Sequence, residues 1–173
     1  VRIAEIFTLS GVLTLLLFLP LLALIPPLEG RRTFWIAWPG TPQIPLLLGM
    51  CGLVLCGLAL LYASARPDLA AVRDLAPGGR RGLQAWLAGS WGGSAHQWKI
   101  LSNAVPYFGI VYLMMLVFMH CRLSVEFAIT LVPGWRDPIF PAYHAISGLQ
   151  AGLATLVLGL GFMRAFGGYK EYL

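Results

Sequence analysis

The residues best suited to chemistry lie near the end of the third long apolar segment. His120, Arg122 and Glu126 are found there, and His144 opens the next apolar segment. Arg122 and Glu126 are four residues apart, so in a helix they share a face and can form an ion pair. Such a pair could cap the helix at the membrane interface, or it could supply a carboxylate that handles protons beside a ligand pocket.

The two histidines offer a second possibility. His120 and His144 could sit at similar depth on consecutive, adjacent helices, where they could ligate a b-type haem. Hydrogen-bonded histidine is the simpler interpretation of each, and His96, in the loop 66–99, is predicted to be solvated. The cysteines have neither metal-site nor redox spacing and are predicted to be small buried hydrophobes: Cys51, Cys56 and Cys121. We predict no metal site and no catalytic residue.

The elements that position these residues are apolar helices. Of 173 residues, 58% are hydrophobic and 11% charged, against roughly 25% charged in a soluble domain. Each charge-free run is long enough for the about 20 residues of a spanning helix: 6–28, 33–65, 100–121 and 138–163. We predict an all-α integral membrane protein, a single transmembrane domain over 1–173, with about four spans: 4–25, 43–65, 101–130 and 140–165.

Charge placement predicts the orientation. The loop 66–99 and the two ends of the chain carry most of the basic residues: Arg2, Arg66, Arg73, Arg80, Arg81, Lys99, Arg164 and Lys170. Within this loop we predict a short interfacial helix from Gly82 to Leu87. The opposite side has Arg31, Arg32 and Arg136, with a predicted aromatic belt of Phe34, Trp35, Trp38 and Trp135. The positive-inside rule therefore predicts a cytoplasmic loop and cytoplasmic termini in the cell inner membrane. The net charge of +5 reflects this topology and not nucleic-acid binding.

Depth follows from helix geometry. At about 1.5 Å per residue, His120 lies about 30 Å along the third helix from Lys99, and Glu126 about 40 Å. These positions fall at the outer end of the hydrocarbon and at the interface beyond it. His144 is predicted at the same outer side.

Several motifs between Ala63 and Leu173 point to a family. They are Arg66–Asp74, Gly89–Trp98, His120–Ala128 and Val132–Tyr143, with weaker upstream matches at Arg2–Leu9 and Gly30–Trp35. The most specific is Pro-Gly-Trp ending at Trp135, followed by Ile-Phe-Pro-Ala-Tyr ending at Tyr143. The chain thus resembles the NrfD-like, polysulphide-reductase-type quinone-interacting membrane subunits. Within them it is most similar to the quinol-oxidising membrane subunit of alternative complex III.

This resemblance implies a larger helical bundle, of which the chain would be the middle part or a reduced relative. It implies a menaquinone or ubiquinone pocket towards the outer leaflet and no haem. It also implies partner subunits, including an iron–sulphur subunit on the outer side and further transmembrane subunits. Glu126 matches an acidic residue of the family's proposed proton path, and His120 matches a histidine of the same stretch. Arg122, Trp135 and His144 complete the candidate quinone and proton site.

Two departures from the family pattern keep other functions open. Family members carry a histidine shortly before the Gly-Arg that is Gly30-Arg31 here, and an aspartate near the start of the next helix. This chain has Ile25-Pro-Pro-Leu-Glu at the first place and Pro45-Leu-Leu-Leu-Gly-Met at the second. The leading hypothesis is a quinone-binding subunit of a respiratory electron-transfer complex. The alternatives are a structural anchor that has lost the quinone site and a haem-b subunit using His120 and His144.

Overall fold

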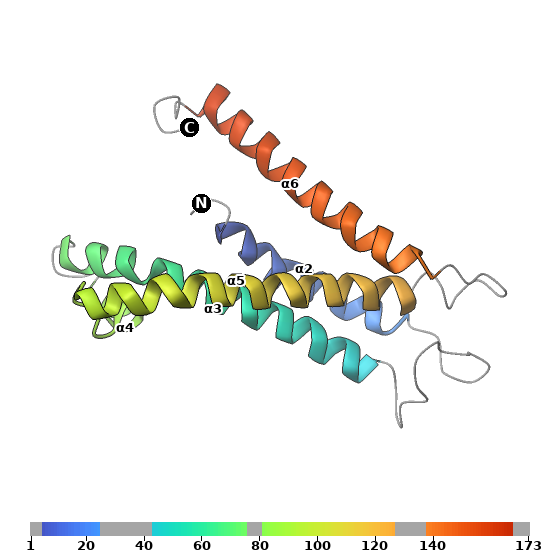
Figure 1. Ribbon diagram of the computed structural model, residues 1–173, viewed down its shortest axis with the longest axis horizontal. Coiled ribbons are helices and arrows are strands. Elements are labelled where there is room, and N and C mark those ends of the chain that lie inside the picture. Colours follow the sequence, from blue (N-terminus) through green and yellow to red (C-terminus); the bar gives the residue numbers. More distant parts are fainter. Residues whose placement is uncertain (1–4, 25–42, 76–80, 127–137, 168–173) are drawn as a thin grey trace. The chain divides into compact units, whose positions relative to one another are not determined.

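The described part of the chain is helical. The computed structural model describes residues 5–24, 43–75, 81–126 and 138–167 and contains no strand within these ranges. The order is η1 (Phe7–Leu9), α2 (Ser10–Leu22), α3 (Gln43–Leu75), α4 (Arg81–Ala88), α5 (Ala95–Ser124) and α6 (Phe140–Phe166) (Figure 1).

Three of these helices, α3, α5 and α6, are long and apolar enough to cross a membrane. The apolar segment Phe7–Leu22 is shorter than the about 20 residues of a full span. Large apolar side chains on the helices are exposed, as at Leu55 (66%) and Leu158 (74%), which suits surfaces that face lipid. The prediction of an all-α membrane protein with about four apolar helices is confirmed.

The helices around the loop 66–99 extend further than their apolar runs. Helix α3 continues to Leu75, beyond the predicted end of the second span at residue 65, and α5 begins at Ala95, before the predicted start of the third span at residue 101. Between them α4 confirms the predicted short helix. A charge-free run ends at the first charged residue, whereas a helix continues until its backbone hydrogen bonds and its packing end. The predicted end of the third span, 127–130, lies outside the described residues.

The start of α5 is set by a capping box. The Ser94 hydroxyl accepts a hydrogen bond from the Gln97 backbone N–H (3.3 Å), and the Gln97 side-chain oxygen accepts one from the Ser94 N–H (3.2 Å). This reciprocal pair satisfies donors that the first helical turn leaves open. The Gln97 amide also donates to the Ser90 carbonyl at 2.9 Å, and its oxygen accepts from the Gly92 N–H at 2.9 Å.

Contacts divide the chain into two units, which are described separately: Val1–Ala23 with Leu47–Leu116, and Leu24–Leu46 with Val117–Leu173. In the first unit, glycines bring the helices close. A Cβ at Gly57 of α3 would lie 3.0 Å from the Tyr112 ring of α5 and 3.4 Å from Thr8. A Cβ at Gly11 of α2 would lie 3.7 Å from Val54 of α3. Small residues of this kind allow close helix approach in membranes.

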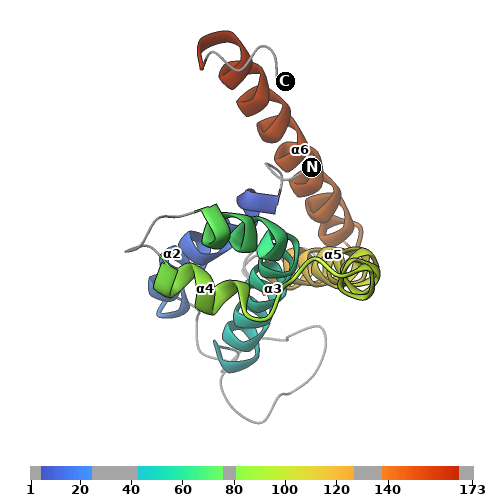
Figure 2. The same ribbon diagram turned by 90° about the vertical axis from the view of Figure 1, so that its left-hand side faces the viewer.

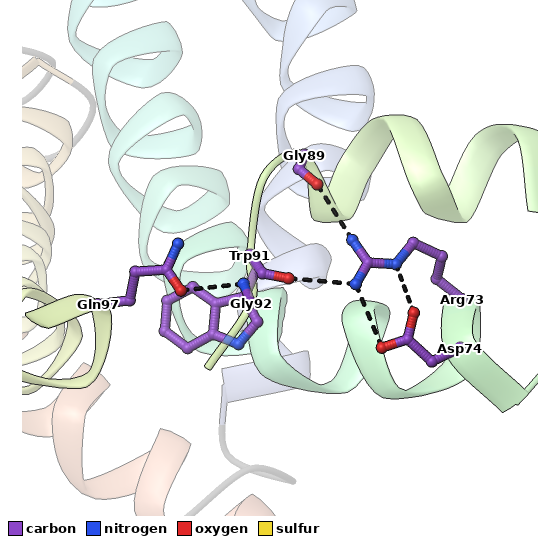
Figure 3. Close-up of polar contacts among 6 residues, drawn as sticks. All are labelled: Arg73, Asp74, Gly89, Trp91, Gly92 and Gln97. Carbon is purple, nitrogen blue, oxygen red and sulfur yellow. Dashed lines mark hydrogen bonds and ion pairs between the residues drawn. The ribbon is translucent and has the colours of Figure 1, made fainter. Parts of the chain in front are cut away.

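Polar contacts hold α4 and the loop after it against the end of α3. Arg73 donates to the Gly89 and Trp91 carbonyls, both at 3.1 Å, and pairs with Asp74 at 2.8 Å (Figure 3). In both ribbon views α4 lies beside this end of α3 (Figure 2), and the Tyr62 hydroxyl donates to the Leu87 carbonyl at 2.9 Å. Ala70, Ala88 and Trp91 form a small buried core there.

Candidate functional site

The second unit contains the end of α5, where the predicted ion pair forms. Arg122 Nη2 lies 3.1 Å from Glu126 Oε1, which confirms the pairing expected from the spacing of four. The Glu126 side chain is 6% exposed and that of Arg122 26%. The helix widens into a π turn at Val125 and Glu126, a feature that is frequent at functional sites. The carboxylate is therefore buried beside a partly accessible cation.

The two histidines of the prediction come together. The ring centroids of His120 on α5 and His144 on α6 are 5.5 Å apart, with the ring planes inclined by 44°. Phe140, one turn before His144, stacks nearly parallel on its ring at a centroid distance of 6.1 Å. Both imidazoles are half-buried. The end of α5 and the start of α6 thus present two imidazoles beside an aromatic wall.

Gly148 determines how closely α6 approaches His120. A Cβ added at position 148 would lie 2.6 Å from His120 Nε2 and 2.7 Å from its Cδ2. These distances are shorter than real Cβ contacts, so the imidazole occupies the space that a side chain would need. The close packing at position 148 is therefore with His120 of this chain.

A weaker contact joins the same two helices. The Cys121 thiol lies 3.7 Å from the Pro141 carbonyl, a distance that suits a weak S–H donor. All three cysteines are free and partly buried. Cys121 therefore contributes to packing at the site. Among the described residues, no other cysteine has the spacing from Cys121 that a redox pair needs.

The donor set determines what the site can do. Imidazole can donate and accept hydrogen bonds, and a carboxylate paired with a guanidinium can take up and release protons. Among the described residues no group of three or more His, Cys, Asp or Glu side chains could hold a metal ion. Haem on His120 Nε2 fits poorly, because this nitrogen lies against the backbone of α6, where the macrocycle would need open space.

Some predicted site residues cannot be placed. Trp135 lies outside the described residues, as do the other belt residues Phe34, Trp35 and Trp38 and the segment that lacks the family's histidine. His96 is exposed, as predicted. Sequence reasoning did not identify Phe140 or the contact of Gly148 with His120. The spacing of these residues could have predicted that they lie together. Phe140, His144 and Gly148 follow one another at intervals of four residues and therefore share one face of α6.

Comparisons with protein families, with curated proteins and with solved structures find no match for this chain. The family resemblance therefore rests on the sequence motifs alone.

Proposed function

We propose that this chain is a quinone- or quinol-binding membrane subunit of a multisubunit respiratory electron-transfer complex. The binding site would lie where α5 ends and α6 begins, near the outer leaflet, in the arrangement that the resemblance to NrfD-like subunits implies. The observation that carries the proposal is the approach of His120 to His144, 5.5 Å between ring centroids. The buried Glu126 follows six residues after His120 in the chain. Polar groups are costly at the edge of the hydrocarbon, and such groups commonly mark functional sites.

The residues present fit a quinone head group. A quinone ring has two carbonyl oxygens that accept hydrogen bonds, and imidazole N–H groups are suitable donors. The aromatic ring of Phe140, stacked on His144, supplies an apolar wall for the flat ring. When bound, quinol supplies two electrons and two protons.

The chain's own residues would handle the protons. His144, or His120 through its other ring nitrogen Nδ1, would orient the hydroxyl oxygens and accept a proton. Glu126, held by Arg122, would pass protons onward as a general base near the outer surface. Electrons would pass to an iron–sulphur subunit on the outer side, so the chain would act as a non-autonomous part of a quinol oxidoreductase.

A structural anchor is the competing function, and the start of α3 favours it. Where the resembled family has an aspartate, α3 begins with an apolar stretch in which Leu46 and Met50 are buried. This stretch offers no polar group to a quinone beyond Gln43. An anchor would keep the α5–α6 packing and hold other subunits without binding quinone.

The test is quinol-dependent turnover of the assembled complex carrying His120→Ala or Glu126→Gln. We expect each variant to lose at least about tenfold in turnover, as is typical when a proton-transfer group is removed. His96→Ala is the matched control, since His96 is exposed in the predicted cytoplasmic loop, and it should retain full turnover. Subunit content measured on native gels separates lost assembly from lost chemistry.

Two outcomes would decide against the proposal. Normal turnover in both site variants, with the complex intact, would leave the anchor function. A Soret band in the purified chain that disappears in His120→Ala would establish the haem function.

A further inference from the structure

A cavity of about 250 Å³ lies in the first unit. Its apolar wall is formed by Ala59 and Ala63 of α3 and by Ala104 and Phe108 of α5. Arg66 and Trp91 line it as well. The cavity therefore combines an apolar wall with a single cationic side chain.

Arg66 is held by aromatic rings and not by a carboxylate. Its guanidinium carbon lies 5.5 Å from the Trp91 ring centroid and 6.0 Å from that of Tyr62, within the range of cation–π contacts. Within residues 5–24, 43–75, 81–126 and 138–167 no carboxylate pairs with Arg66, and its buried Nε has no hydrogen-bond partner. A buried donor left without an acceptor is unfavourable, so this geometry suits a ligand that brings an anionic acceptor.

The position of the cavity along the helices indicates which kind of anion would bind in it. Arg66 follows the charge-free run that ends at Ala65, and Lys99 precedes the run that starts at Ile100, so we expect both basic residues at the membrane surface. Ala59 lies seven residues before Arg66, about 10 Å deeper at the helical rise. The cation thus lies at headgroup level, and the apolar wall extends from it into the hydrocarbon.

We propose that this cavity binds one anionic glycerophospholipid. The phosphate would accept hydrogen bonds from the Arg66 guanidinium, whose planar fork matches phosphate oxygens. One acyl chain would lie along the wall formed by Ala59, Ala104 and Phe108. A neutral quinone would fill the apolar part and leave the cation uncompensated, which is why the charge favours the lipid. Basic pockets between helices at the membrane surface bind anionic headgroups in this way.

The test uses the full chain, delipidated in detergent, and native mass spectrometry. Dioleoyl phosphatidylglycerol and dioleoyl phosphatidylcholine are titrated separately, since they share acyl chains and differ in net charge. We expect one tightly bound lipid and about fivefold preference for phosphatidylglycerol, the effect of roughly one basic residue on an anionic lipid. Arg66→Gln should abolish this preference, and Arg66→Lys should retain most of it because the charge remains.

Three further variants separate the cavity from general surface charge. Ala104→Phe fills the apolar wall and leaves Arg66 in place, so it should weaken binding of both lipids; Ala154→Phe, at an exposed position of α6, should not. Lys99→Gln removes an exposed charge at the same level and should preserve the preference.

Equal binding of the two lipids by the wild-type chain would overturn the proposal. Unchanged binding in both Arg66→Gln and Ala104→Phe would also overturn it. So would displacement of the bound lipid by an equimolar short-chain quinone, because that would identify the cavity as a site for neutral amphiphiles. None of these outcomes depends on turnover, so they leave the histidine site untested.

Discussion

The imidazole of His120 occupies the space where a side chain at position 148 would begin. Its Nε2 would lie 2.6 Å from a Cβ placed on Gly148. The orientation of His120 and the approach of α6 to α5 at this point therefore depend on a residue that has no side chain. A substitution at Gly148 should therefore change the position of the His120 ring.

Gly148→Ala should displace His120 or push the two helices apart. Overpacking of this kind costs about 1–3 kcal/mol, which outweighs the about 1 kcal/mol that alanine gains over glycine within a helix. Gly152→Ala is the matched control, because nothing lies within 4 Å of a Cβ there. Thermal unfolding in detergent should show a lower midpoint for the first variant and an equal or higher one for the second.

The cause can be isolated by removing the ring. In a His120→Ala background, Gly148→Ala should lose most of its effect, because the atoms it would overlap are absent. The coupling in this double-mutant cycle should fall between about 0.5 and 3 kcal/mol, the range for residues in contact. Strictly additive effects would mean that the loss of stability arises elsewhere.

Arg122 and Glu126 should respond unequally to neutralisation. Arg122→Gln leaves a buried carboxylate without this cation, whereas Glu126→Gln leaves a guanidinium that is 26% exposed and can reach water. We expect Arg122→Gln to reduce the free energy of unfolding by about 1–3 kcal/mol and Glu126→Gln to reduce it by less. Denaturant titration of the two variants side by side gives the comparison, and the reverse order would contradict the assigned burial.

Glycine at position 57 should be required for the close packing of α3 against α5. An added methyl would lie 3.0 Å from Cε2 of the Tyr112 ring and 3.4 Å from Thr8, so two neighbours on different elements would have to move. Gly57→Ala should lower stability by about 1–3 kcal/mol. Gly109→Ala, on α5 with open space around the added methyl, serves as the control. An equal unfolding midpoint in both variants would argue against this helix packing.

Gly89 ends α4 in a conformation that other residues avoid. Its φ is +53°, and its N–H donates to the Ala85 carbonyl at 3.0 Å, so it closes the helix in the left-handed region. Gly89→Ala should cost about 1 kcal/mol. Gly82→Ala lies inside α4 with nothing near the new methyl and should be neutral or stabilising. Hydrogen exchange of the α4 amides should rise only in the first variant.

Local spacing was enough to predict the features that depend on neighbours along the chain. The pairing of Arg122 with Glu126 follows from a separation of four residues in any helix. The short helix that became α4 and the start of α6 at Phe140 lie within two residues of their predicted positions. The capping box at Ser94 and Gln97 was also readable from the sequence, and it would have placed the start of α5 correctly.

The sequence alone determined that this is an all-α membrane protein, because long charge-free runs must satisfy their backbone hydrogen bonds within helices. The tertiary structure decided which side chains meet across helices. His120 lies against Gly148, 28 positions away, and Arg66 against Trp91, 25 positions away, and no local rule selects these partners. Apolar helices can pack on any of several faces, so only the packed arrangement brings the two histidines together and forms the cavity beside Arg66.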